Sequence, residues 1–329
     1  MKLNHIAIIG LGSIGRRHLR LIKQIRPEIK ITVVRSGKGE HCAEEEIADN
    51  IVQSIKAATS LGIEAAIIST PSTFHLSNAI TLLKSDIHLL IEKPLSNTME
   101  YTEELVRLSK TSKAIILIGY VLRYDPAAIR FKQLLLEEDI GEKLHIRVEC
   151  GSYLPDWRPD QDYKKTVSAS TELGGGVLLE LSHELDYINW FFGQPSDIQA
   201  LLRNSKTLGI DVEDQVDILL SYENDCPISV QIDFCRRKPM RVCSVLTTKG
   251  QVTWNAMSKK VVSEWVGQEK KVNEFSFERD HIYQEQLIHF LDCIENKKTP
   301  AVTLNDGVDV MQMIDACRKS NNMNRKIKI

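Results

Sequence analysis

The residues best suited to chemistry follow a short apolar run. The run His88–Ile91 is typical of a strand buried on both faces, and Glu92, Lys93 and Pro94 follow it directly. In an open parallel sheet, ligands bind beyond the carboxyl ends of the strands. The Lys93 ammonium would therefore face a ligand. Taken alone, the tripeptide is more simply interpreted as a surface ion pair at a strand end.

A histidine flanked by carboxylates forms a second candidate centre. Glu180, His183 and Asp186 recur at every third residue of a predicted helix over 178–187, so neighbours in the series share a face. Three glycines, Gly174–Gly176, permit close backbone approach before it. A histidine beside carboxylates can act as a general base. The spacing matches no metal-binding motif, so we predict no metal site. The alternative is a structural histidine.

An aromatic and charged loop, residues 153–163, precedes that helix. Such a segment is poor core material, whereas its rings and charged groups suit a polyhydroxylated ligand through stacking and hydrogen bonds. The other interpretation is a surface loop with incidental aromatic residues. The predicted substrate-binding residues are Tyr153, Trp157, Arg158 and Tyr163 in this loop, with Arg123 and Tyr124 earlier in the chain.

The elements that would position these residues begin with a glycine-rich turn. Ile6–Ile9 is typical of a buried strand, and Gly10, Gly12 and Gly15 follow it in a Gly-x-Gly-x-x-Gly pattern that opens a helix. Gly10 permits the tight turn, Gly12 lets the backbone approach a pyrophosphate, and Gly15 lets helix and strand pack closely. The N–H groups at the helix start would bind phosphate. The predicted residues of this site are Gly10, Gly12, Ser13, Ile14 and Gly15.

The residue after the second predicted strand, Ile29–Val34, indicates which dinucleotide binds. NAD-binding folds usually carry an Asp or Glu there, which accepts a hydrogen bond from the ribose 2′-hydroxyl. Here Arg35 occupies the position, and Ser36 and Lys38 follow it. A cation and a hydroxyl suit a 2′-phosphate, so we prefer NADP(H) to NAD(H). If Arg35 only stacks on the adenine, either cofactor can bind.

The order of the elements predicts a two-domain α/β protein. Strand and helix alternate six times over residues 1–122, which predicts an N-terminal Rossmann domain with a doubly wound parallel sheet. Over residues 123–329 several short segments alternate apolar and polar residues, and two helices, about 280–296 and 305–320, close the chain. This pattern predicts a C-terminal α+β domain with a large, open, mainly antiparallel sheet.

Composition and charge restrict the class of protein. The net charge of −2 gives no electrostatic reason to expect nucleic acid as a partner. The longest uncharged apolar run, residues 114–122, is too short to span a bilayer, so we expect no membrane partner. Seven cysteines without paired spacing predict reduced thiols, and no signal peptide is visible. We therefore expect a cytoplasmic protein.

In their order and spacing, these motifs resemble one family over nearly the whole chain. It is the glucose–fructose oxidoreductase, inositol dehydrogenase and rhizopine-catabolism family (Gfo/Idh/MocA). The matching segments are Gly10–Gly15, Ser69–His75, Glu92-Lys93-Pro94, Gly119–Pro126, Gly174–Gly176 with His183, and Thr299-Pro300.

The resemblance implies a fold, a cofactor and roles for individual residues. It implies a Rossmann domain followed by an α/β domain whose open sheet forms a homodimer or homotetramer. Lys93 would lie near the nicotinamide and the reacting hydroxyl, often before a cis proline, and His183 would exchange the proton of that hydroxyl. The resemblance also implies cofactor contacts after the predicted strands 64–69 and 88–91. The residues concerned are Thr70, Pro71, His75, Glu92 and Lys93.

One departure from the family pattern concerns the catalytic acid. The family usually has an Asp four residues before the histidine, where this chain has Leu179, and Glu180 one place later would substitute for it. A shift of one residue turns a helical side chain by about 100°. We predict an NAD(P)-dependent oxidoreductase that moves hydride between nicotinamide and a hydroxyl-bearing carbon of a sugar, nucleotide-sugar, sugar acid or cyclitol. The alternatives are reduction of a C=N or C=C bond, and a non-catalytic nucleotide-binding sensor or regulator on the same fold.

Overall fold

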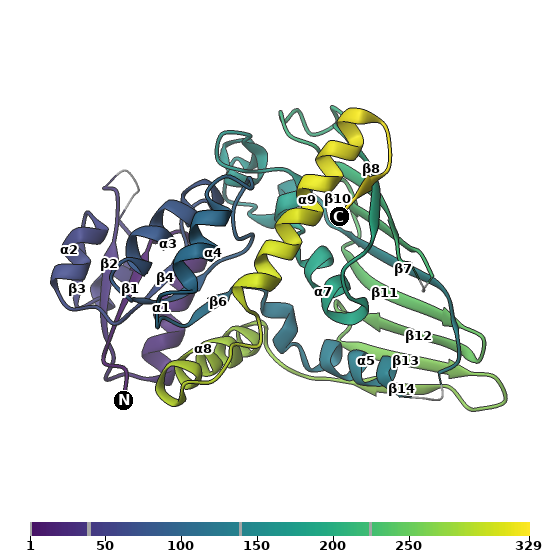
Figure 1. Cartoon of the computed structure of the whole chain (residues 1–329), viewed down its shortest axis with the longest axis horizontal. Coiled ribbons are helices and arrows are strands. Elements are labelled where there is room, and N and C mark those ends of the chain that lie inside the picture. Colours follow the sequence, from purple (N-terminus) through teal and green to yellow (C-terminus); the bar gives the residue numbers. More distant parts are fainter. Residues whose placement is uncertain (1, 38–40, 138–139, 224–225) are drawn as a thin grey trace. The chain divides into compact units, whose positions relative to one another are not determined.

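The computed structural model describes residues 2–37, 41–137, 140–223 and 226–329. The chain forms two compact units (Figure 1). Unit 1 comprises residues 1–121 and 278–308, and unit 2 comprises residues 122–277 and 309–329. The predicted boundary between 122 and 123 lies one residue from the first of these divisions. The return of residues 278–308 to unit 1 is a feature that the linear division at 122 did not include.

Unit 1 contains a six-stranded parallel sheet in the order β3-β2-β1-β4-β5-β6. This order, which reverses direction between β1 and β4, confirms the predicted doubly wound Rossmann sheet. The three-residue strand β3 was not predicted from the sequence, because so short a run has no readable periodicity. The strands are β1 (His5–Ile9), β2 (Lys30–Val34), β3 (Asn50–Val52), β4 (Ala65–Ile68), β5 (His88–Ile91) and β6 (Ile116–Ile118).

The helices of unit 1 cover this sheet and include one from the far end of the chain. Leu287 and Phe290 of that helix belong to the same buried cluster as Ile6 of β1 and Leu19 of α1. Figure 1 shows α8 beside α1, with which it is in contact. The helical segments are α1 (Ser13–Ile25), η1 (Ala43–Ile47), α2 (Ile55–Ser60), η2 (Ser72–Phe74), α3 (His75–Leu83), α4 (Thr102–Ser109) and α8 (Arg279–Asn296).

Unit 2 contains a nine-stranded sheet in the order β14-β13-β12-β11-β7-β10-β9-β8-β15. Strands β7 and β10 pair in parallel and every other neighbouring pair is antiparallel, which confirms the predicted open, mainly antiparallel sheet. Much of this sheet is in green in Figure 1. The strands are β7 (Lys143–Gly151), β8 (Asp197–Arg203), β9 (Gln215–Ser221), β10 (Ile228–Asp233), β11 (Met240–Thr247), β12 (Gly250–Asn255), β13 (Lys260–Trp265), β14 (Lys271–Glu274) and β15 (Ile327–Lys328).

The helices of unit 2 pack an apolar layer against one face of that sheet. Phe131 of α5, Tyr187 of α7 and Trp254 of β12 are fully buried, and their rings contact one another or the ring of Phe191. The helical segments are η3 (Val121–Tyr124), α5 (Pro126–Leu136), η4 (Leu154–Trp157), η5 (Tyr163–Lys165), η6 (Val167–Ala169), α6 (Val177–Glu180), α7 (His183–Phe192) and α9 (Leu304–Met323), of which α9 continues from unit 1.

Two further observations concern the sequence-based predictions. Within the four described ranges, no helix combines the length and the apolar character needed to cross a membrane. Among the described cysteines, no pair forms a disulfide.

Candidate functional site

The glycine-rich turn connects β1 to α1 in unit 1. Gly10 has a φ of +92°, a backbone conformation that favours glycine, and its N–H donates to the Val34 carbonyl oxygen at 3.0 Å. A Cβ on Gly15 would lie 2.2 Å from the Gly10 carbonyl oxygen and 2.7 Å from Ser69 Oγ. Gly15 is therefore needed for the packing of α1 on the turn, as predicted.

Gly12 is glycine for a different reason. A Cβ at this position would meet no protein atom within 4 Å, so the packing of the chain does not require glycine here. Gly12 is the N-cap of α1 and supplies no side-chain cap, and the first turn of α1 has no acidic residue. The exposed Ser13 and half-buried Ile14 complete this turn. A helix start with open space and uncapped N–H groups is suited to a pyrophosphate.

The segment after β4 forms the other wall of the turn. Ser69 Oγ donates to the Gly10 carbonyl oxygen at 2.8 Å, which fixes the two strand ends to each other. Thr70 Oγ1 accepts a hydrogen bond from Asn78 Nδ2 at 3.3 Å, and Pro71 is half-buried. The predicted cofactor residues Thr70 and Pro71 thus adjoin the glycine-rich turn.

Glu92, at the end of β5, is buried and hydrogen-bonded on both carboxylate oxygens. Its Oε1 lies 2.7 Å from Nε2 of the buried His18 on α1, and its Oε2 accepts the Lys93 N–H at 3.2 Å. A Cβ on Gly119 would lie 3.0 Å from Glu92 Oε2, so no side chain fits there without a shift. Burial alone would raise the pKa of Glu92, but the His18 hydrogen bond and the charges of His18 and Lys93 outweigh it and lower the pKa.

Lys93 itself is half-buried and precedes a cis proline, Pro94. His75, which is fully buried at the start of α3, lies with Nδ1 2.9 Å from the Pro94 carbonyl oxygen and with Nε2 2.8 Å from the Thr70 carbonyl oxygen. The structure therefore holds the Lys93 segment from both sides, by His18 through Glu92 and by His75 through Pro94. His75, which was predicted to contact the cofactor, contacts the backbone carbonyl oxygens of Thr70 and Pro94.

The predicted 2′-phosphate site contains an acid as well as a base. Arg35 follows β2 directly, and its guanidinium forms an ion pair with the carboxylate of Glu45 on η1. Ser36 is exposed, and Lys38 lies outside the described residues. The cation that suggested NADP(H) is thus bound to a carboxylate that the sequence pattern did not reveal.

The helix predicted over 178–187 in unit 2 is two helices. Helix α6 ends at Glu180 and α7 begins at His183, because the N–H groups of Ser182 and Glu184 donate three residues back instead of four. The prediction of one continuous helix was therefore wrong, although His183 and Asp186 still lie three residues apart within α7. Both Glu180 and His183 are half-buried, whereas Leu179 is buried.

Asp186 binds an arginine from another element. Three contacts of 2.7–3.2 Å join the Arg123 guanidinium of η3 to its carboxylate, and both side chains are buried. On the same helix, the buried Glu184 accepts a hydrogen bond from Arg241 Nε at 2.7 Å. Two ion pairs with buried carboxylates therefore anchor α7 immediately after His183. Arg123 was predicted to hold substrate, and the structure places its guanidinium on Asp186.

Replacing Asp186 by Ala should strongly destabilise unit 2. The substitution leaves the buried Arg123 guanidinium without this carboxylate, and breaking a buried pair costs about 3–5 kcal/mol. Asp315→Ala is the matched control, because it breaks the exposed pair with Lys319, which is worth about 0–1 kcal/mol. Thermal unfolding followed by circular dichroism measures both variants. Equal changes in Tm would contradict this account of the pair.

The aromatic residues of loop 153–163 contact other loops of unit 2. Trp157 Nε1 donates to Ser152 Oγ at 2.7 Å, and its ring meets the edge of Phe234. The Arg237 guanidinium lies 3.5 Å from the centre of the Tyr153 ring, and Tyr163 Oη donates to the Leu208 carbonyl oxygen at 2.8 Å. The contacts of these three aromatic side chains thus hold the loop against the rest of unit 2. Arg158 is exposed, and Tyr124 of η3 is half-buried.

Two of the three glycines before α6, Gly175 and Gly176, closely approach other parts of the chain. A Cβ on Gly175 would lie 2.3 Å from the Val167 carbonyl oxygen, and one on Gly176 would lie 2.3 Å from Glu213 Oε1. The small size of these two glycines therefore serves the packing of η6 and of Glu213 against the start of α6.

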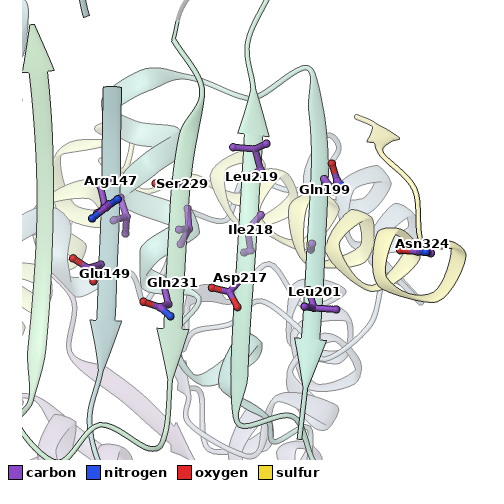
Figure 2. Close-up of a pocket in the computed structure, with 13 residues that line it drawn as sticks. Arg147, Glu149, Gln199, Leu201, Asp217, Ile218, Leu219, Ser229, Gln231 and Asn324 are labelled. Atoms are coloured by element: carbon purple, nitrogen blue, oxygen red, sulfur yellow. The ribbon is translucent and has the colours of Figure 1, made fainter. Parts of the chain in front are cut away.

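A hollow of about 600 Å³ lies on the face of the nine-stranded sheet. Figure 2 shows side chains of four adjacent strands lining it, among them Arg147, Glu149, Asp217 and Gln231. Leu201 and Leu219 on this face are also exposed, at 53% and 45%. None of the residues predicted to bind substrate lines this hollow.

Sequence reasoning missed two residues that organise the candidate site. His18 follows Gly15 by three residues, one turn along α1, and the spacing alone gave no partner for it. Glu45 belongs to a run of three glutamates, which is typical of a solvated surface. Only the contacts with Glu92 and Arg35 distinguish these residues from ordinary helix residues.

Two family models match most of the chain. Residues 4–120 match the NAD-binding Rossmann fold of the oxidoreductase family GFO_IDH_MocA, and residues 132–329 match the C-terminal alpha/beta domain of the same family. The two matches reproduce the order of domains that the sequence predicts.

Curated relatives match nearly the full length. The scyllo-inositol 2-dehydrogenase (NAD(+)) of Bacillus subtilis (strain 168) is 24% identical over 312 residues, which cover 90% of this chain and 88% of the relative. The 1,5-anhydro-D-fructose reductase of Ensifer adhaerens is 23% identical over 319 residues, which cover 93% and 92%. A solved structure of levoglucosan dehydrogenase in complex with NADH and L-sorbose has a TM-score of 0.89 at 17% identity, covers 100% of this chain and 99% of that chain, and shows a shared fold.

Proposed function

Because the chain belongs to the Gfo/Idh/MocA oxidoreductase family, we propose that it is an NAD(P)-dependent enzyme that transfers hydride between nicotinamide and a hydroxyl-bearing carbon of a carbohydrate-like molecule. The candidate substrates are a sugar, a nucleotide-sugar or a cyclitol. The glycine-rich turn carries the proposal, since it leaves open space at Gly12 that the packing of the chain does not need. The names of the relatives, which concern inositols and anhydro-sugars, support the substrate class.

The residues of unit 1 would hold the dinucleotide. The turn from Gly10 to Gly15 would bind the pyrophosphate through N–H groups, and the segment of Thr70 and Pro71 would contact the cofactor beside it. His75 and Glu92 would position this segment and Lys93. When bound, the nicotinamide supplies the site that accepts or donates the hydride.

Lys93 and His183 would act on the reacting hydroxyl. The Lys93 ammonium would hold the substrate oxygen and stabilise negative charge that develops on it. The His183 imidazole would take the hydroxyl proton in oxidation and return it in reduction. Glu180 would orient His183 in place of the family's usual Asp, whose position holds the buried Leu179.

The residues of loop 153–163 would determine which polyol binds. Tyr153, Trp157 and Tyr163 offer ring faces, and Arg158 offers a charged donor at an exposed position. Tyr124 would add a hydroxyl, and Arg123 would act through Asp186 by anchoring α7.

Assembly and location extend the proposal. The exposed Leu201 and Leu219 on the open sheet suit burial between copies, so we propose a homodimer or homotetramer formed through this face. The charge balance and cysteine pattern support a cytoplasmic enzyme that needs neither nucleic acid nor a membrane.

The test is a two-step assay on the purified, cofactor-stripped chain. Titration with NADH and NADPH, followed by nicotinamide fluorescence, should show saturable binding. Incubation with NAD⁺ or NADP⁺ and a panel of inositols, anhydro-sugars and nucleotide-sugars should then show reduction of the nicotinamide by at least one polyol. Binding of neither nucleotide would overturn the proposal. Binding without turnover on any member of the panel would favour the sensor function instead.

A further inference from the structure

The end of β2 determines which dinucleotide a Rossmann domain accepts, because the adenosine ribose lies beside it. In this chain Arg35 occupies that position, and its N–H donates to the Val52 carbonyl oxygen at 2.9 Å, which continues the sheet. The backbone of Arg35 is therefore fixed by strand pairing. An arginine here with no acid beside it would favour a 2′-phosphate and hence NADP(H).

The partner of Arg35 is built into the fold. Glu45 forms an ion pair with Arg35, and the two side chains are only 9% and 15% exposed. Oε1 of Glu45 also accepts the Cys42 N–H at 3.0 Å, in a capping box at the start of η1. The carboxylate is thus held by the backbone of η1 as well as by Arg35, unlike a mobile surface acid.

The charges around this pair are balanced in the same way. On the adjacent residue of η1, Glu44 forms an ion pair with Arg20 of α1. The Cys42 N–H bond and, with a smaller effect, the Arg35 charge lower the pKa of Glu45, so the carboxylate is ionised at neutral pH. A 2′-phosphate carries about −1.5 to −2 charges and would meet this carboxylate as well as the guanidinium. A ribose 2′-hydroxyl, in contrast, can donate to a carboxylate.

We propose that Glu45 makes this chain select NAD(H) over NADP(H), by pairing with Arg35 and by adding a fixed negative charge at the end of β2. The acid that NAD-binding folds usually carry at the end of β2 is supplied here from η1, ten residues further along the chain. The inference rests on the proposed function and specifies its cofactor. It reverses the preference for NADP(H) that Arg35 and Ser36 suggest in the sequence.

The substitution Glu45→Gln tests the proposal, with Glu46→Gln as the matched control. Glutamine retains an oxygen that can accept the Cys42 N–H, so η1 keeps its cap while the charge is lost. Glu46 is the next residue and is exposed, and its replacement removes the same charge from η1. Fluorescence titration gives the ratio of the dissociation constants for NADPH and NADH in each protein.

The unaltered chain should bind NADH more tightly than NADPH by a factor of about 10 or more. The reason is that placing the 2′-phosphate beside the Glu45 carboxylate brings two negative charges together, which costs more free energy than a tenfold change in affinity requires. Glu45→Gln should shift that ratio about tenfold towards NADPH, and Glu46→Gln should leave it nearly unchanged. Adding Arg35→Ala to Glu45→Gln should remove the gain in NADPH affinity, since the released guanidinium is its source.

Three results would overturn the inference while leaving the proposed function intact: a preference of the unaltered chain for NADPH, an unchanged ratio in Glu45→Gln, or an equal shift in Glu46→Gln. Binding of neither nucleotide by the unaltered chain would overturn the proposed function and this inference together. Circular dichroism of each variant verifies that it is folded.

Discussion

Replacing Lys93 by Ala should lower kcat/KM for the polyol identified in the screen on the order of a thousandfold. A positioned group that stabilises or transfers charge at the reacting atoms contributes about 10² to 10⁴ in rate. Lys93 is held between two buried histidine contacts, to Glu92 and to the Pro94 carbonyl oxygen, so its place does not depend on its own side-chain contacts. The fold and the Tm should therefore change little. His183→Ala should cause a loss of similar size.

The measurement is the initial rate of nicotinamide reduction, together with NADH titration and thermal unfolding of each variant. Lys110→Ala is the control, because it removes an exposed lysine at the end of α4. The dinucleotide is expected to gain most of its affinity at the glycine-rich turn, so NADH affinity should fall far less than turnover in both catalytic variants. If folded Lys93→Ala or His183→Ala protein kept full turnover, the assignment of these roles would be wrong.

The second large effect separates two glycines of the same motif. Gly15→Ala should destabilise unit 1 by about 3 kcal/mol and abolish measurable NADH binding, because its Cβ would lie 2.2 Å from the Gly10 carbonyl oxygen and displace the turn. Gly12→Ala should leave the Tm unchanged, since no protein atom lies within 4 Å of the added Cβ. It should still weaken NADH binding by about tenfold or more, because the methyl group enters the space left for the pyrophosphate.

Each of these variants serves as the control for the other. Thermal unfolding and NADH titration are measured on both variants. Gly62→Ala is a further control, because Gly62 is far along the chain from the motif and a Cβ there would also meet no atom within 4 Å. Because Gly62 has a φ of +76°, its replacement has a backbone cost of its own and should affect Tm without affecting NADH affinity. Unchanged NADH affinity in Gly12→Ala would contradict the placement of the pyrophosphate.

Local patterns in the sequence were sufficient for most of unit 1. Strand-like runs, a glycine motif and alternating helices each depend on residues close together in the chain, and the parallel sheet and the turn at Gly10 were predicted from them. The open sheet of unit 2 was predicted from alternation in the same way, although β8, β12 and β14 were not identified. Three of its strands thus had patterns too weak or too short to recognise.

Contacts between distant residues decided the remaining features. The amphipathic pattern of α8 shows that one face is buried, but only the packing of Leu287 and Phe290 beside Leu19 shows that the helix returns to unit 1. The break between α6 and α7 lies between Glu180 and His183, because hydrogen bonds at Ser182 and Glu184 reach back three residues instead of four. The apolar residues of this segment, in contrast, recur with the spacing of one continuous helix.

The sequence by itself determined a dinucleotide-binding unit, since motif spacing carries that information, and its resemblance to the oxidoreductase family suggested Lys93 and His183 as candidate residues. The tertiary structure alone decided what the charged residues do. Arg35 and Arg123 are both cations that could meet a ligand, and each is bound to an acid that lies far from it in the chain or in a different element, Glu45 and Asp186. The physical reason is that the role of a charged side chain depends on the group it pairs with. That partner is determined by the tertiary fold and not by the spacing of residues in the sequence.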